Sequence, residues 1–212
     1  NGGAHANNSL DFQEFMILPL GFDSFSNSLR AGVEIFHNLK ISLNKLSLST
    51  SVGDEGGFAP NLTSNTQALD IILDSIEKSG YKSGEEVYLG LDVASSEFYK
   101  DERYIMSDGN TYNSDDFCQY LKNLCDNYPI ISIEDGMAEN DWDGWKSLTE
   151  NLSNKIQLVG DDVFVTNKRI FEKGINKEVA NAILIKFNQI GTITETLETI
   201  DLARKNNYNY II

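Results

Sequence analysis

Four charged residues each end a largely apolar run, and their side chains are acids and a base that could take part in catalysis. Asp92, Glu134 and Asp161 are acids in this position, whereas Lys186 is a base. The four runs cover residues 87–91, 130–133, 156–160 and 182–185. Such runs are typical of strands that are buried on both faces, as in a parallel sheet. Because a charge there is costly unless it is used or paired, we predict a functional site at the strand ends.

The three acids favour a bound cation. If their strands are neighbours, Asp92, Glu134 and Asp161 converge at one edge of the sheet, where two carboxylates about 4 Å apart repel by about 4 kcal/mol at an effective dielectric of about 20. A hard divalent cation would remove this repulsion, and a ligand set of oxygens alone favours Mg²⁺, with Mn²⁺ next. The alternative is that one or more of these acids caps a helix or pairs with an arginine.

Lys186 allows two interpretations. As a structural counter-ion it only balances the acids. As a base it must lose its proton near neutral pH, and lowering a lysine pKa by about 3 units costs about 4 kcal/mol. Burial and a neighbouring cation can supply such a shift. A metal beside a lysine base would suit the removal of a proton α to a carboxylate.

A glycine-rich loop at 51–61 carries Glu55 between Gly53 and Gly56. Glycines on both sides allow the backbone to approach a ligand closely and to move. A protonated glutamate in this loop could give a proton to a leaving hydroxyl. The alternative is an exposed glutamate in a turn. His5, in a loop rich in glycine and asparagine, is ambiguous by itself.

The elements that must position these residues follow a repeated strand–helix pattern. Apolar spacing and capping residues predict helices over 24–43, 64–80, 114–124, 142–152 and from 192 onward. Strand–helix units repeated at least four times predict an α/β fold with a parallel sheet. Because no strand end carries the glycine-rich phosphate turn of the nucleotide-binding folds, we favour a (β/α)8 TIM-type barrel, or most of one. Such barrels carry their catalytic residues at the carboxyl ends of the strands.

Three local patterns carry further expectations. The helix at 24–43 should bury a stripe of apolar residues at spacings of three and four: Leu29, Val33, Phe36, Leu39 and Leu43. Ser114 should cap the helix that follows it. The helix that begins at Thr192 should turn Leu197, Ile200 and Ala203 inward.

The composition limits the class of partner. The 212 residues include 32 acids against 17 lysines and arginines, a formal net charge of −15. This acidity argues against nucleic acid and anionic membranes, which attract basic patches. With no signal peptide and no apolar run near the roughly 18 residues of a membrane helix, we expect a cytoplasmic protein, and with no linker a single domain over residues 1–212. Cys118 and Cys125 lack metal or redox spacing and should be core thiols.

Seven ordered motifs resemble those of the enolase family, the 2-phosphoglycerate dehydratases of glycolysis. They are NGGAHA at 1–6, QEFMI at 13–17, VGDEGG at 52–57, LDVASSEFY at 91–99, SIEDG at 132–136, GDDVFVTN at 160–167 and IKFNQIGT at 185–192. The resemblance runs along the whole chain and is nearer to the bacterial branch. It implies a Mg²⁺-dependent lyase that converts 2-phospho-D-glycerate to phosphoenolpyruvate on a TIM-type barrel, of which this chain is an incomplete portion.

The resemblance also implies the ligand set. Asp92, Glu134 and Asp161 match the residues that hold a tightly bound Mg²⁺, and a second Mg²⁺ joins with the substrate in the complete enzyme. Glu134 and Asp161 match positions at the substrate site as well, together with Lys186.

Five residues match the catalytic and substrate-binding groups of the family. Lys186 matches the base that takes the C2 proton, and Glu55 matches the acid that protonates the departing C3 hydroxyl. Glu14 matches the carboxylate that assists Glu55. It lines the substrate site together with Gln13 and with His5, which belongs to a mobile loop.

The sequence departs from the family pattern at its ends. The family's N-terminal α+β domain and its last barrel strand or strands have no counterpart in these 212 residues. We therefore expect little turnover by this chain alone, and we assign the activity, and a homodimer or higher homo-oligomer, to the complete enzyme. One alternative is a racemase or cycloisomerase of the same superfamily, although no Lys-x-Lys pair ends a strand here. Another is a non-catalytic binding or scaffold module, for which the sequence names no partner.

Overall fold

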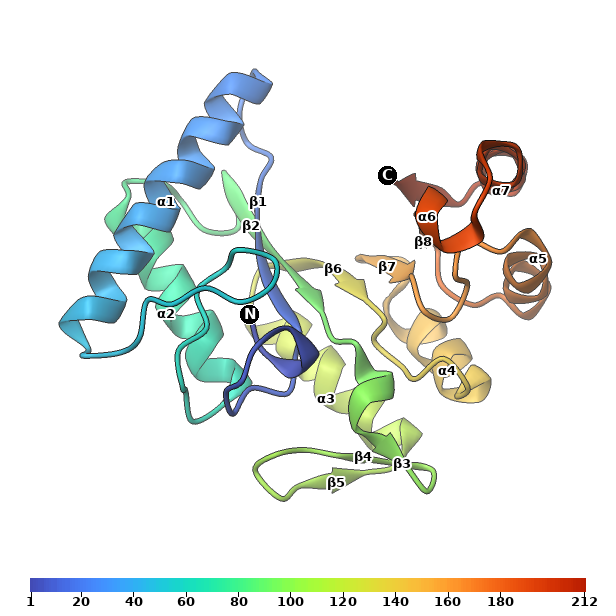
Figure 1. The fold of residues 1–212 in the computed structure, drawn as a ribbon, viewed down its shortest axis with the longest axis horizontal. Coiled ribbons are helices and arrows are strands. Elements are labelled where there is room, and N and C mark those ends of the chain that lie inside the picture. The colour runs from blue at the N-terminus through green and yellow to red at the C-terminus, as the bar shows by residue number, and fades with distance from the viewer. The chain divides into compact units, whose positions relative to one another are not determined.

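The computed structural model describes residues 1–212, and the chain divides into two compact units. The first comprises Asn1–Asp92, Met106–Asn110 and Leu124–Ile131, and the second comprises Val93–Ile105, Thr111–Asn123 and Ser132–Ile212. Figure 1 follows the chain from its N-terminus in blue to its C-terminus in red. None of the helices combines the length and the hydrophobicity that crossing a membrane requires.

The first unit combines two long helices with an antiparallel strand pair. Its elements are η1 (Gly3–His5), β1 (Glu14–Pro19), α1 (Phe25–Lys45), α2 (Asn65–Lys78) and β2 (Val87–Asp92). α1 and α2 pack against each other, as Figure 1 shows. The predicted cap of α2 is confirmed, because the Gln67 N–H donates to Ser64 Oγ at 3.1 Å. In the β1–β2 pair, Glu14 lies opposite Asp92.

β2 is buried, as its apolar run predicts. Val87, Leu89 and Leu91 are each at most 1% exposed. The Leu89 N–H donates to the carbonyl oxygen of Pro129 at 2.9 Å, so the segment that leads into β6 (Ile130–Glu134) runs beside this strand within the first unit. The strand that delivers Asp92 is therefore fixed by hydrogen bonds on both of its edges.

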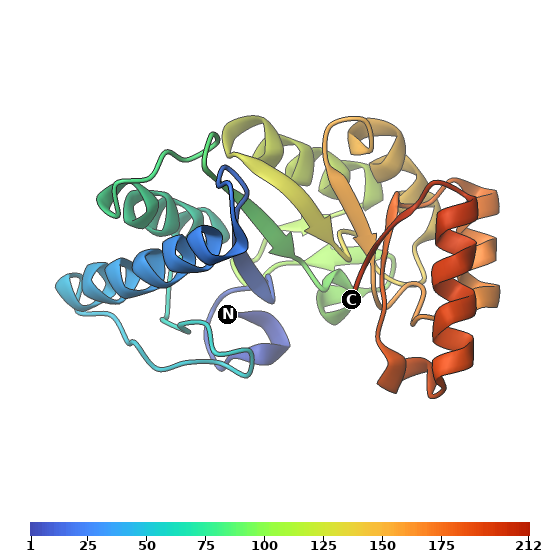
Figure 2. The ribbon, with the colours of Figure 1, turned by 90° about the horizontal axis from the view of Figure 1, so that it is seen from above.

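The second unit contains a parallel sheet with the order β6-β7-β8-β9. The later strands are β7 (Gln157–Gly160), β8 (Ala182–Leu184) and β9 (Asn209–Ile211), and the helices between the strands are α4 (Trp142–Leu152), α5 (Lys168–Lys177), α6 (Phe187–Ile190) and α7 (Ile193–Lys205). α5 and α7 pack side by side, as Figure 2 shows. These consecutive strand–helix units confirm the predicted parallel α/β architecture.

A small antiparallel sheet is anchored to α4 through Tyr104. The sheet consists of β3 (Tyr99–Lys100), β4 (Arg103–Ile105) and β5 (Thr111–Tyr112), and it lies in the chain between η2 (Ser95–Phe98) and α3 (Ser114–Asn127). The Tyr104 hydroxyl donates to Asp141 Oδ2 at 2.7 Å and accepts the N–H of Ala138 at 3.1 Å. Asp141 Oδ1 in turn accepts the N–H of Gly144 in the first turn of α4, at 2.9 Å. Burial raises the pKa of Tyr104 far above its usual range, so this hydroxyl remains a donor.

The apolar stripe predicted for α1 is only partly buried. Leu29, Val33 and Phe36 are 56%, 48% and 38% exposed, whereas Ala31 and Ile35 on the adjoining face are at most 1% exposed. The expectation is wrong for these three residues because the neighbouring elements cover a face of the helix that is rotated from the centre of the apolar stripe. The spacing correctly predicts a helix but not which part of its apolar surface is covered.

Two further local expectations are corrected. Ser114 does not cap α3, because Asn113 Oδ1 accepts the N–H of Asp116 at 2.8 Å and takes that role. Ser114 is the first helical residue, and its hydroxyl donates to Asp141 Oδ2 at 2.6 Å. Leu197 on α7 is 55% exposed instead of turned inward, whereas Ile200 and Ala203 are buried as predicted. The Ser114 correction has a tertiary cause, since a carboxylate distant in sequence takes its hydroxyl.

The Tyr104 network gives a stability prediction. Tyr104→Phe removes the donor to a buried carboxylate and the acceptor of a buried N–H, so the free energy of unfolding should fall by about 1–3 kcal/mol. Urea unfolding followed by circular dichroism measures this loss. Tyr99→Phe is the matched control, because the Tyr99 ring packs against Tyr104 with centroids 4.6 Å apart in the same small sheet. Equal losses for the two variants would contradict the assignment to the hydrogen bonds.

Candidate functional site

Lys186 and Asp161 meet at the carboxyl ends of two neighbouring parallel strands. Asp161 directly follows β7, and Lys186 follows β8 as the N-cap residue of α6. Lys186 Nζ lies 2.5 Å from Asp161 Oδ2, and the exposed fractions of the two side chains are 45% and 8%. The structure therefore brings together two of the residues that the sequence singles out, in the second unit.

The acids around Lys186 set its proton affinity. Burial acts to lower the pKa of Lys186, but the hydrogen bond and charge of Asp161, with the charges of Glu134 and Asp162, outweigh it and raise that pKa above its ordinary value. The ammonium is thus the favoured form of Lys186 in this structure. For Lys186 to act as a base, the charges on these acids must be balanced by a further positive charge.

Thr166 and Gln189 hold this pair in place. Thr166 is fully buried, and its Oγ1 accepts the N–H of Lys186 at 2.9 Å. Gln189 Nε2 donates to Asp161 Oδ1 at 3.2 Å, and Thr166 Oγ1 lies 3.2 Å from Gln189 Oε1. Sequence reasoning gave neither residue a role, although both lie within the motifs at 160–167 and 185–192. Their side chains fix the backbone of the lysine and one oxygen of the aspartate.

Asp135 is a third residue that sequence reasoning missed. It directly follows Glu134, is 4% exposed, and has a positive φ of 42°. Its two carboxylate oxygens accept the backbone N–H groups of Asp161 and Asp162, at 3.0 and 2.8 Å. Burial, with the charges of those two aspartates, raises the pKa of Asp135, while the two backbone hydrogen bonds oppose the shift. The available signal was its position next to a strand-end acid.

His5, Glu14 and Glu55 form a cluster in the first unit. His5 Nδ1 lies 3.4 Å from Glu14 Oε1, and one nitrogen or oxygen from each of the three side chains lies within 4.8 Å of the others. Glu55 is exposed, whereas His5 and Glu14 are partly buried. Three predicted residues are thus brought together from η1, β1 and the loop at 51–61. Their imidazole and carboxyl groups are able to exchange protons with a ligand.

Gly53 allows the loop that carries Glu55 to approach the loop that carries His5. A Cβ atom at Gly53 would lie 2.6 Å from the carbonyl oxygen of His5, closer than real Cβ contacts allow. The next residue, Asp54, donates its N–H to the same oxygen at 3.1 Å. The glycine therefore allows a close backbone approach to a neighbouring loop, and the predicted approach of this loop to a ligand stays a prediction.

The predicted metal ligands occur in both units. Asp92, at the end of β2 in the first unit, is 5% exposed, and its Oδ2 accepts the side-chain N–H of Gln13 at 2.8 Å. In the second unit, Glu134 ends β6 and Asp161 directly follows β7, and the Glu134 backbone oxygen accepts the N–H of Val93 at 3.0 Å. Each of the three is a carboxylate at the end of a strand, as the sequence predicts.

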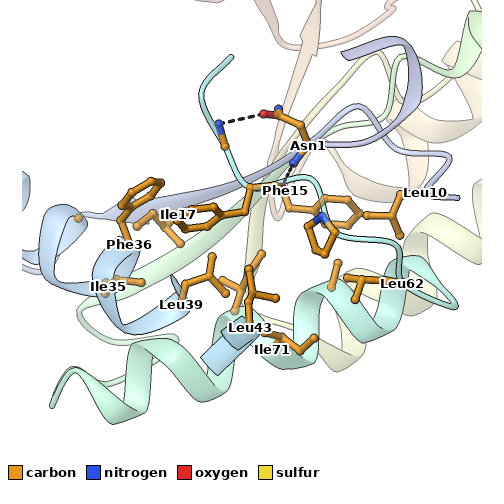
Figure 3. A pocket seen from close by; sticks show the side chains of 16 residues that line it. Asn1, Leu10, Phe15, Ile17, Ile35, Phe36, Leu39, Leu43, Leu62 and Ile71 are labelled. Carbon is orange, nitrogen blue, oxygen red and sulfur yellow. Dashed lines mark hydrogen bonds between the residues drawn. The ribbon is translucent and has the colours of Figure 1, made fainter. Parts of the chain in front are cut away.

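An apolar cavity of about 180 Å³ lies in the first unit, apart from these residues (Figure 3). Side chains from β1, α1, α2 and the loop before α2 form its wall, and they include Phe15, Phe36 and Ile72. At its edge, the side-chain oxygen of Asn1 accepts the N–H of Gly57 at 2.9 Å. None of the predicted site residues lines this cavity, so it is not the candidate site.

Comparison with known families agrees with the motifs and the fold. A family model described as the enolase C-terminal TIM barrel domain matches residues 1–212. The α/β fold with its parallel strands is accordingly part of a TIM-type barrel. Enzymes of lyase or isomerase type are built on this domain, and they act on small-molecule substrates. The chain therefore belongs to the enolase C-terminal TIM barrel domain family.

Proposed function

We propose that this chain is the barrel portion of a Mg²⁺-dependent enolase that dehydrates 2-phospho-D-glycerate to phosphoenolpyruvate. The observation that carries the proposal is the contact of 2.5 Å between Lys186 Nζ and Asp161 Oδ2, in a chain of the enolase family. It places a lysine beside a strand-end acid, and the superfamily uses a lysine or histidine base next to bound Mg²⁺. We further propose that the complete enzyme is of the bacterial type, cytoplasmic and homo-oligomeric.

The donor set fits a hard divalent cation. We assign Asp92, Glu134 and Asp161 as the residues that would hold Mg²⁺, because all three offer only carboxylate oxygens. Asp92 and Asp161 are buried, at 5% and 6% exposure, so a cation held by them would be largely shielded from water. When bound, the ion would stabilise the negative charge that develops on the substrate carboxylate as the C2 proton leaves.

The proton transfers are assigned to Lys186 and Glu55. Lys186 takes the proton from C2, and the electron pair of that bond becomes the second bond between C2 and C3. The C3 hydroxyl departs, and Glu55 protonates it so that it leaves as water. Balancing the charges of Asp161 and Glu134 removes the interactions that raise the pKa of Lys186, which frees its amine to accept the proton.

Glu14, His5 and Gln13 are assigned to the substrate side of the same reaction. Glu14 and His5 lie within 4.8 Å of Glu55 in side-chain atoms, so they orient its carboxyl group and the hydroxyl that it protonates. Gln13 holds the Asp92 carboxylate by its hydrogen bond of 2.8 Å. These contacts support a role for the η1 and 51–61 loops in forming the substrate site.

Replacing the proposed base tests the reaction directly. In the complete protein, Lys186→Ala should lower kcat for 2-phosphoglycerate by about 10²–10⁴, measured by the absorbance of the enol-phosphate product. Lys168→Ala is the matched control, because Lys168 is 49% exposed at its side chain and pairs with Glu198 at 3.0 Å on the helical surface. Near-normal turnover by the Lys186 variant would refute the base assignment.

Replacing a proposed ligand tests the metal site. Asp161→Asn removes one charge from the ligand set, so the Mg²⁺ affinity of the complete protein should fall by about tenfold or more, a loss of about 1.4 kcal/mol. Isothermal titration calorimetry with MgCl₂ alone measures this change. Asp201→Asn serves as the control, since Asp201 is an exposed acid on α7 that lies 3.9 Å from Arg204. An unchanged affinity in Asp161→Asn removes that residue from the ligand set.

A further inference from the structure

Asp135 lies where several backbone segments of the second unit meet. Its N–H donates to the carbonyl oxygen of Val159 at 3.0 Å, at the end of β7. Its own carbonyl oxygen accepts the N–H and the hydroxyl of Ser95, at 3.2 and 2.8 Å. Its carboxylate accepts the N–H groups of Asp161 and Asp162. One buried residue therefore ties together the segments that follow β2, β6 and β7.

The carboxylate of Asp135 meets a specific backbone need. The N–H groups of Asp161 and Asp162 lie just past β7, and buried backbone donors must find acceptors. A carboxylate offers two acceptor oxygens in one planar group, so it fixes both N–H groups relative to each other. An asparagine could accept only one of them and would present its NH₂ group to the other.

The geometry points to a role for Asp135 that extends beyond the fold. We propose that Asp135 is a positioning residue for the metal site: by holding the backbone of Asp161, it directs the Asp161 carboxylate toward the cation. Its two oxygens accept the N–H groups of Asp161 and Asp162, so the role that we propose for it is exerted through the Asp161 backbone. This inference rests on the proposed function, because it takes Asp161 to be a ligand of Mg²⁺.

The position of Asp135 links it to the proposed metal site: it directly follows Glu134, and its carboxylate accepts the backbone N–H of Asp161. Oxygens of Asp135, Asp161 and Asp162 lie within 4.8 Å of one another, where like charges repel. The two hydrogen bonds from the N–H groups of Asp161 and Asp162 to one side chain fix the direction of the Asp161 backbone. Groups that orient metal ligands in this way contribute about 10- to 100-fold to metal affinity.

The test compares two buried aspartates in the complete protein. Asp135→Asn should weaken Mg²⁺ binding by about 10- to 100-fold in calorimetry with MgCl₂ alone, and it should speed hydrogen exchange at the Asp161 and Asp162 amides. Asp141→Asn is the matched control, since Asp141 is 8% exposed and also accepts a backbone N–H, that of Gly144. The control should lower the thermal unfolding temperature but leave Mg²⁺ affinity unchanged.

A double-mutant cycle establishes that the effect passes through Asp161. In an Asp161→Asn background, Asp135→Asn should change Mg²⁺ affinity by less than about twofold, because the group that it positions has lost its charge. If Asp135→Asn does not fold, Asp135→Glu is used instead, since it keeps the charge but shifts both acceptors by one methylene. Lower Mg²⁺ affinity is expected for that variant as well.

The possible outcomes separate the two proposals. Unchanged Mg²⁺ affinity in a folded Asp135 variant, with normal binding by the parent protein, overturns the positioning role and leaves the proposed function intact. An equal loss of affinity with and without the Asp161 charge also overturns it. If the parent protein itself binds no Mg²⁺, the proposed function fails and the inference fails with it.

Discussion

The parallel pairing of β7 with β8 is the constraint on which the candidate site depends. Gly160 lies opposite Ile183 in this pair, so the residues that follow both strands emerge at the same edge of the sheet. Asp161 and Lys186 therefore approach to 2.5 Å although 25 residues separate them in the chain. Because the pairing register fixes where each strand ends, a shift of one residue would turn one of these side chains to the opposite face. The pairing of the two strands therefore decides that Asp161 and Lys186 can act together.

The concentration of negative charge around Lys186 is the second constraint, and hydrogen bonds and an ion pair offset it. Asp135 is stabilised by two backbone N–H groups, and Asp161 by the side chains of Lys186 and Gln189. The same acids raise the pKa of Lys186, which opposes its use as a base. The pKa of Lys186 therefore depends on the charges of these acids, and a cation bound by the acids would change it.

Local sequence patterns predicted the elements well where local energetics decide them. The helix at Ser64 begins at its predicted cap, and the runs that lead to Asp92, Glu134 and Asp161 form strands. The patterns failed where a distant group intervenes. Ser114 gives its hydroxyl to Asp141 instead of capping its helix, and much of the apolar stripe on α1 remains exposed. Periodicity identifies an apolar face but contains no information about which neighbours cover it.

The sequence by itself determined which residues are candidates for the chemistry, because a charge at the end of a buried strand is costly and seldom incidental. It identified Asp161 and Lys186 and the cluster of His5, Glu14 and Glu55, and its motifs indicated the family. Only the tertiary structure decided how these groups are held. Thr166 binds the backbone of Lys186, and Asp135 binds that of Asp161. Contacts between a side chain and a distant backbone N–H depend on the register and spacing of folded strands, which residue types alone do not specify.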